Sequence, residues 1–318
     1  MSPRKSAAMV ESPMRPFAAS VALVALVAPL FLGGCDGQAK LSEAKAVEHV
    51  DRLAKLADTD VEEIRRGLPE GAAKLQNVLF EKEKEPFDPR VVRTAMRKTR
   101  ESIKDLQLAK ATFSAVLSLT GEAYASDQES DGLVSKNLFS FFPSIEPVKQ
   151  GKYTEGFGDL VDLRGARIGD DLQWIAAAPI GPEGARRGYF VAGWSLRSFA
   201  YHLEQQLKSD LRNATKDKKK EPPLLYVFVI VGGKAYAASN TPEVNRLAVQ
   251  GLSAHEKVPG DTVLRGRIEI ENRSFGYAAK RAKLMGDKVA VLVLRSEVLA
   301  TAGGGSSLSK TKRQEKDR

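Results

Sequence analysis

Few side chains in this sequence are spaced for catalysis or for binding a metal. The three histidines are far apart in the chain, at His49, His202 and His255. A serine followed three residues later by a lysine can supply a nucleophile and its base. That spacing occurs at 42–45, inside a helical pattern, and at 307–310, inside a polar tail. No glycine-rich phosphate loop follows a predicted strand. We therefore expect a protein that is not an enzyme and that carries no metal or cofactor.

The one cysteine of the chain, Cys35, follows an apolar stretch near the N-terminus. Residues 17–34 read FAASVALVALVAPLFLGG, and the basic residues Arg4, Lys5 and Arg15 precede them. A basic segment, an apolar segment and small residues before a cleavage point are typical of a secretory signal peptide. The alternative is a plain transmembrane anchor with an incidental cysteine.

The four residues Leu32-Gly33-Gly34-Cys35 resemble the lipobox of bacterial lipoproteins. The resemblance implies that residues 1–34 are removed and that Cys35 is lipidated with acyl chains such as palmitate. Two or three acyl chains hold a protein at a bilayer far more firmly than one. We expect the mature protein to be tethered to membrane lipid on the extracytoplasmic, periplasmic face. Asp36 disfavours outer-membrane transport in enterobacterial lipoproteins, a rule that varies between bacterial groups, so the choice of inner or outer membrane stays open.

Length and composition are those of a globular protein. The chain has 318 residues, 42% of them hydrophobic and 28% charged, which suits about two domains. The formal net charge is +9, and the run Lys216–Lys220 contributes to it without an aromatic residue to stack on a base. The charge is compatible with an anionic membrane surface. We expect no binding to nucleic acid.

Helical spacing of apolar residues dominates the region 35–110. One helix is predicted over 40–66 and ends at Gly67-Leu68-Pro69, a second covers 69–83, and a third begins at Asp88-Pro89. We interpret this region as a helical stalk that leads into the first domain.

A short motif occurs twice after the stalk, as GEAYASD at 121–127 and GKAYAASN at 233–240. Around each copy the order of predicted elements is strand, hairpin, strand, helix, hairpin, strand. We therefore predict two related domains, at 111–213 and 224–299, in which Tyr124 and Tyr236 occupy equivalent places on the second strand. A basic linker at 214–223 joins them, and 300–318 is a disordered basic tail.

The segments GEAYASDQESDGLVSKNLFSFFPSIEPVKQG and WIAAAPI…RRGYFVAGWSL resemble PAS-like, or Cache, sensor domains. Two such units behind a long helix resemble the double Cache arrangement of bacterial extracytoplasmic sensors. The resemblance covers about residues 90–300 and implies an α+β fold with two antiparallel five-stranded sheets. Two features depart from the family. No apolar run of about 20 residues follows Cys35, and the aromatic-arginine-aspartate pattern of amino-acid-binding members is missing.

In PAS-like folds the ligand lies between the sheet and the helices that cover it. The resemblance places five candidate ligand-binding residues near a pocket of the first domain: Tyr124, Trp174, Tyr189, Trp194 and Arg197. Alternatively, the aromatic residues are core and Arg197 is a solvated helix residue. Asp127 and Asp131 could bind a cationic ligand, although aspartates in a polar turn are often only turn formers.

The sequence thus favours a lipid-anchored extracytoplasmic sensor or binding module. It would bind a small molecule at 111–213 and report to a separate, membrane-embedded signalling partner. The alternative is a ligand-free scaffold lipoprotein of the cell envelope that binds another protein. A cavity with convergent polar groups favours the sensor, and a packed layer with an exposed apolar patch favours the scaffold.

Overall fold

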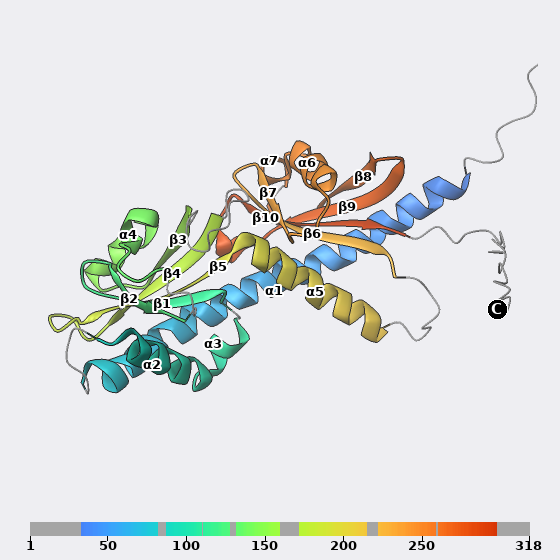
Figure 1. Ribbon diagram of the computed structural model, residues 1–318. Coiled ribbons are helices and arrows are strands. Elements are labelled where there is room, and N and C mark those ends of the chain that lie inside the picture. The colour runs from blue at the N-terminus through green and yellow to red at the C-terminus, as the bar shows by residue number, and fades with distance from the viewer. Residues whose placement is uncertain are drawn as a thin grey trace, which may run out of the picture.

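A helix of 43 residues, α1 (Gly33–Leu75), runs along two β-sheets (Figure 1). The computed structural model describes residues 33–81, 87–109, 111–127, 132–159, 172–214, 222–258 and 260–297. The apolar stretch of the predicted signal peptide up to residue 32, Asp131, the basic run Lys216–Lys220 and the predicted tail at 300–318 lie outside these residues. None of the helices in the described ranges is long and apolar enough to cross a membrane.

The predicted end of the first helix at Gly67-Leu68-Pro69 is wrong, because α1 continues through Pro69 to Leu75. Proline removes one backbone donor from a helix and normally breaks it. Here Leu68 and Leu75 are fully buried on one side of the helix, so packing outweighs the lost hydrogen bond. A π-helical turn, η1 (Gln76–Phe80), follows. After residue 86, α2 (Pro89–Glu101) begins as predicted, since the Asp88 carboxylate accepts a 2.8 Å hydrogen bond from the Arg90 amide. The helix α3 (Lys104–Leu108) completes the region.

The helical region is part of both cores. The first half of α1 packs on the second sheet so closely that a Cβ atom added to Gly276 would meet the backbone of Ser42 and Glu43. Its second half packs on the first sheet, where Gly71 lies against the ring of Phe190. One continuous apolar cluster therefore joins α1 to both sheets.

Each sheet has five antiparallel strands. The first contains β1 (Phe113–Leu117), β2 (Ala123–Ser126), β3 (Thr154–Asp159), β4 (Leu172–Ile180) and β5 (Gly188–Ser195), in the order β2-β1-β5-β4-β3. The second contains β6 (Leu224–Val231), β7 (Lys234–Ala237), β8 (Leu264–Ile270), β9 (Arg273–Arg281) and β10 (Val289–Ser296), in the order β7-β6-β10-β9-β8. The two orders are the same, which confirms the internal repeat and the predicted α+β fold.

The repeated tyrosines occupy matching places. Tyr124 lies on β2 and Tyr236 on β7, the second strand of each sheet. Tyr236 belongs to the apolar cluster around α1, and Tyr124 packs against the same cluster. Both rings therefore lie on the side of their sheet that faces α1, which we call the α1 face.

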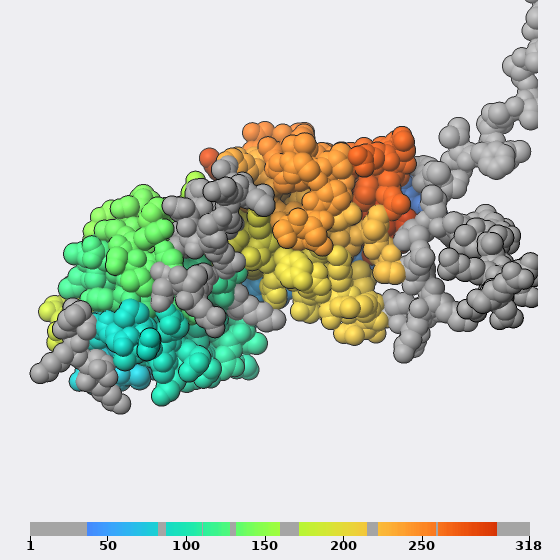
Figure 2. Space-filling model, in the orientation of Figure 1, coloured from blue at the N-terminus to red at the C-terminus, as the bar shows by residue number. Residues whose placement is uncertain are grey.

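The opposite side of each sheet, which we call the distal face, has its own cover. The short helix α4 (Leu138–Phe141) and the 3-10 helix η2 (Pro143–Gln150) cover the first sheet, and α6 (Glu243–Gly251) and α7 (Ala254–Lys257) cover the second. A 3-10 turn, η3 (Lys283–Met285), joins β9 to β10. The predicted amphipathic helix α5 (Leu196–Ala214) connects the two sheets, and the space-filling view shows them as two adjoining lobes (Figure 2).

Candidate ligand site and the contacts of the long helix

The distal face of the first sheet is a packed apolar layer. Residues of β1, β4 and β5 alternate in direction, so Ala115, Ile175 and Val191 point to this side. Asn137 caps α4 by accepting a 3.0 Å hydrogen bond from the Phe139 amide, which directs Phe139 over Gly121. The cover contributes fully or nearly fully buried side chains: Leu138, Phe139, Phe142, Ile145 and Val148.

Polar groups gather at the rim of this layer. The ring of Tyr189 meets the ring of Phe139 edge-on, with centroids 5.5 Å apart. The Lys149 ammonium lies 4.6 Å from the centroid of Phe139 and pairs with Glu146 at 2.7 Å. The Arg186 guanidinium donates a hydrogen bond to the backbone carbonyl of Lys149. The Tyr189 phenol and the Lys149 ammonium therefore border the same aromatic ring, and Arg186 lies beside Lys149.

The Tyr189 hydroxyl is a donor at neutral pH. Burial raises the pKa of Tyr189, and the nearby charges of Arg186 and Lys149 offset only part of that effect. Within the described ranges its hydroxyl has no hydrogen-bond partner. An incoming carboxylate could accept hydrogen bonds from this phenol and from the two cations, which is a strong arrangement because two donors are charged.

The two tryptophans lie on the α1 face of the sheet instead. Trp174 and Trp194 are paired across β4 and β5, and their rings stack with centroids 4.6 Å apart. Phe199 of α5 continues the stack at 5.1 Å. The Trp194 indole donates a 2.9 Å hydrogen bond to the Ala109 carbonyl. Both indoles are 1% exposed, so this stack belongs to the core beneath α1 and α5.

The five candidate residues do not converge on one site. Tyr124, Trp174 and Trp194 face α1, Tyr189 faces away from it, and Arg197 is half-buried on α5. Ligand binding by these residues stays a prediction, and of the five Tyr189 alone lies on the distal face. Successive side chains of a strand point to opposite faces of the sheet. Tyr189 and Trp194 are five residues apart on β5, so they must point to opposite faces.

Sequence reasoning missed the other rim residues. Lys149 lies in the last turn of η2 and Arg186 lies in the hairpin between β4 and β5, so only the folded chain brings them together. The sequence held a signal for Arg186 alone, the basic pair at 186–187 directly before the strand of Tyr189. Asp127 has a structural role, since its carboxylate pairs with Arg100 and accepts a 2.8 Å hydrogen bond from the Ser114 amide. No cluster of metal-binding side chains occurs in the described ranges.

Arg65 of α1 joins the first sheet to the second domain. Its guanidinium donates to both carboxylate oxygens of Glu155 on β3, at 2.6 and 3.1 Å, and to the Leu284 carbonyl in η3 at 3.0 Å. The Leu284 amide donates a 2.9 Å hydrogen bond to Asp58, also on α1. The Tyr153 hydroxyl donates a 2.7 Å hydrogen bond to Glu155. The pKa of Tyr153 is raised, first by burial and second by the negative charge of Glu155. We call this set of contacts the junction.

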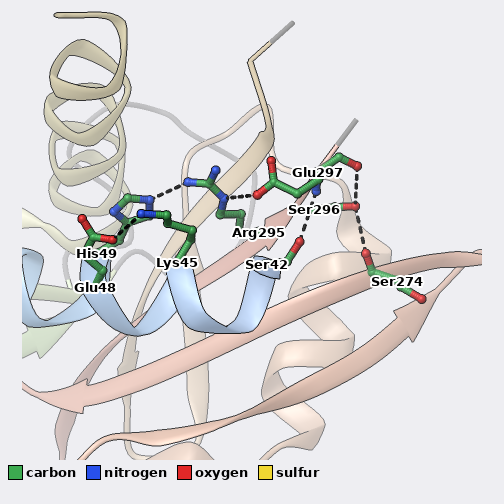
Figure 3. A network of polar contacts seen from close by, with 8 residues as sticks. All are labelled: Ser42, Lys45, Glu48, His49, Ser274, Arg295, Ser296 and Glu297. Carbon is green, nitrogen blue, oxygen red and sulfur yellow. Dashed lines mark hydrogen bonds and ion pairs between the residues drawn. The ribbon is translucent and has the colours of Figure 1, made fainter. Parts of the chain in front are cut away.

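A second polar network fastens the last strand to the start of α1 (Figure 3). Arg295 of β10 lies 2.6 Å from Nε2 of His49 and donates a 2.7 Å hydrogen bond to Glu297. The Glu297 amide donates to the Ser42 hydroxyl at 3.2 Å. The pKa of His49 is lowered to about 4, first by burial and then by Arg295. The ring is therefore neutral, and because Arg295 is always a donor, Nε2 of His49 is the acceptor.

Comparison with known proteins supports the fold. No family model matches the chain, and the curated proteins compared with it gave no match. The extracellular domain of a protein described as a histidine kinase aligns with a TM-score of 0.53 at 10% identity, covering 82% of this chain and 93% of that chain. A domain of a sensory box/GGDEF family protein from Vibrio parahaemolyticus aligns with a TM-score of 0.52 at 10% identity, covering 82% and 97%. The chain therefore has the fold of a double, Cache-type sensor domain.

Proposed function

We propose that this protein is a lipid-anchored extracytoplasmic sensor that binds a small molecule in its first domain and reports to a separate membrane partner. The shared fold and the lipobox pattern ending at Cys35 support the class of protein and its anchor. The observation that carries the ligand site is the rim of the first distal face, where Tyr189 and Lys149 border Phe139 and Arg186 binds the Lys149 carbonyl.

The rim suits a small carboxylate with an apolar part. Two cations and a protonated phenol would bind the carboxylate, and the ring of Phe139 would contact the apolar part. The site lies within 111–213, the range predicted from the sequence. Binding without catalysis is sufficient for this role.

A path of contacts could carry the response from the rim to α1. The end of η2 bears Lys149, and its first half is tied to β3 by two hydrogen bonds, from Thr154 to the Ile145 carbonyl at 3.2 Å and from Ser144 to the Phe157 carbonyl at 3.3 Å. The same strand carries Glu155, which holds Arg65 at the junction. A ligand that moved η2 would thus act on α1 and, through it, on the second domain.

A ligand-free scaffold is the second candidate. The observation that favours it is the close packing of the distal face, where Phe142 and Ile145 are 0% exposed. A ligand larger than the rim would have to displace this cover.

A thermal-shift screen of the mature chain against small carboxylates separates the two candidates. A compound present at 100 times its Kd stabilises the folded chain by about 2.7 kcal/mol, which raises Tm by several degrees. The sensor predicts at least one such compound. A screen of mono-, di- and amino-carboxylates without a shift would favour the scaffold.

The anchor has its own test. Cys35→Ala should abolish labelling of the protein with a fatty acid and leave an uncut precursor held by residues 17–34. Cys35→Ser should fail in the same way, because its hydroxyl keeps the size of the side chain but lacks the thiol. A Cys35→Ala protein that is cut and labelled like the wild type would rule out the lipobox.

A further inference from the structure

A shallow groove of about 300 Å³ lies between η1 and α2, apart from the rim of the ligand site. Its floor and sides are formed by Val78, Arg90, Val91, Thr94, Ala95 and Lys98. Val78 is 39% exposed, which leaves an apolar side chain open to solvent beside the helix. We call this feature the α2 groove.

The α2 groove is bordered by two cations that have no partner among the described residues. The 13 residues of α2 contain five basic side chains and one acidic side chain. Two of the five are engaged, since Arg93 donates to the Ser126 carbonyl and Arg100 pairs with Asp127. Arg90 and Lys98 are exposed, and their side chains make no ion pair or hydrogen bond with the described residues. The fifth, Arg97, is exposed but does not line the groove, so two of the three cations of α2 that have no partner among the described residues border it.

The spacing of the two cations decides what can fill the groove. Arg90 and Lys98 are eight residues apart on one helix, which is about 12 Å along its axis. One small anion cannot contact both. A peptide segment of about two helical turns can, with acidic side chains at its ends and apolar side chains between them over Val78, Val91 and Ala95.

The position of α2 in the molecule favours a protein over a lipid surface as the occupant of the groove. The start of α1 and the end of β10 meet at one end of the molecule, where Glu297 binds Ser42. The helix α2 lies at the opposite end (Figure 1). If Cys35 is anchored, the groove lies far from the lipid surface, so the segment that it binds belongs to a part of the membrane partner that extends out from the bilayer.

We propose that the α2 groove docks an acidic, amphipathic segment of a partner protein. The inference deepens the proposed function, on which it rests, because it names the surface by which the sensor meets its partner and the chemistry of that partner. Two observations carry it: the positive charge of Arg90 and Lys98, which an acidic segment complements, and the exposed side chain of Val78 in the same groove.

A defined peptide tests the proposal. The probe is a fluorescent 14-residue helical peptide with leucines at i, i+3, i+4 and i+7 and glutamates on both flanks. Its anisotropy is measured with the mature chain and with the double variant R90E/K98E. The matched control is K152E/K288E, which makes the same charge change at two other exposed lysines. We expect at least a tenfold loss of affinity for R90E/K98E and less than a threefold change for the control.

A groove-filling variant and a comparison with lipid vesicles complete the test. Thr94→Trp fills the exposed side of the groove without changing charge and should weaken the peptide at least fivefold, provided that its Tm equals that of the wild type. Wild-type chain that does not bind the peptide, or equal losses in R90E/K98E and K152E/K288E, would overturn the proposal. Stronger binding to vesicles of anionic lipid than to the peptide would overturn it in favour of a membrane surface. Carboxylates that raise Tm in the thermal-shift screen should raise it equally in R90E/K98E. A wrong docking proposal and a wrong ligand site therefore give different results.

Discussion

Arg65 and Glu155, which are 90 residues apart in the sequence, form a bidentate ion pair with hydrogen bonds of 2.6 and 3.1 Å. The pair joins α1 to the edge strand of the first sheet, and the same guanidinium holds the Leu284 carbonyl of the second domain. One side chain of the long helix therefore contacts both domains.

Removal of this side chain should destabilise the whole molecule. Hydrogen bonds to charged groups contribute about 1.5–3 kcal/mol, and the 37% exposure of Arg65 lowers the value expected here to about 1–2 kcal/mol. Arg65→Met should reduce the free energy of unfolding by that amount in urea. Arg66→Met is the control, because Arg66 is 58% exposed and pairs with Asp105 away from both sheets. Equal losses for the two variants would show that the junction has no special role.

His49 should make stability depend on pH. Its pKa is about 4 in the folded chain and about 6.5 in the unfolded chain, so unfolding takes up a proton between these values. The contribution of neutral His49 to the free energy of unfolding is therefore complete above pH 6.5. It should be lost as the pH falls toward 4, which lowers the free energy of unfolding by about 3 kcal/mol.

The difference between wild type and His49→Gln isolates this effect, because Lys45, Glu48, Arg295 and Glu297 surround the site in both proteins. Glutamine does not titrate, and its carbonyl can still accept from Arg295. Urea titrations at pH 7 and pH 4.5 should show a smaller loss for the variant. Parallel curves for the two proteins would mean that His49 is not buried against Arg295.

Gly276 should be intolerant of any side chain. A Cβ atom there would lie 2.4 Å from the Ser42 carbonyl carbon, and backbone cannot move aside as a flexible side chain can. Gly276→Ala should therefore lift the start of α1 from β9, with a loss of stability of about 1–3 kcal/mol and faster proteolysis after Lys40 and Lys45. Gly251→Ala, where no atom lies within 4 Å, is the control and should be close to neutral. A stable, protease-resistant Gly276→Ala protein would contradict this packing.

The tryptophan stack should act as core. Trp174→Ala should cost about 3–5 kcal/mol in the free energy of unfolding, because a fully buried aromatic ring is replaced by a cavity. Trp174→Phe keeps most of the ring volume and should cost less. If Trp174→Ala left stability unchanged but abolished ligand binding, the stack would be a ligand site after all.

The repeat and the hairpins could be predicted because their signals are local. Hairpins are marked by Gly121, with φ +92°, and by the turn at 181–184. Between the turns, side chains along each strand alternate between the two faces of the sheet. The continuation of α1 through Pro69 could not be predicted from a local rule. It depends on the burial of Leu68 and Leu75 against elements that come later in the chain.

The site was harder to predict than the fold. Aromatic residues were the visible signal, yet the tryptophans fill the core on the α1 face and Tyr189 lies on the other side. The contacts of Lys149 with Arg186 and of Arg65 with Glu155 arise only after folding, since each pair is far apart in sequence. Parity along β5 was the one available clue that Tyr189 and Trp194 lie on opposite faces of the sheet.

The central claim, a carboxylate sensor site at the rim of the first domain, is tested most directly by calorimetric titration of the strongest thermal-shift compound. The titration compares wild type with Arg186→Gln and with Arg187→Gln, a neighbouring exposed arginine that has no side-chain partner among the described residues. The account predicts at least a tenfold weaker Kd for Arg186→Gln, because a charged donor to the carboxylate is lost, and an unchanged Kd for Arg187→Gln. Equal affinity of wild type and Arg186→Gln for the compound would contradict the account.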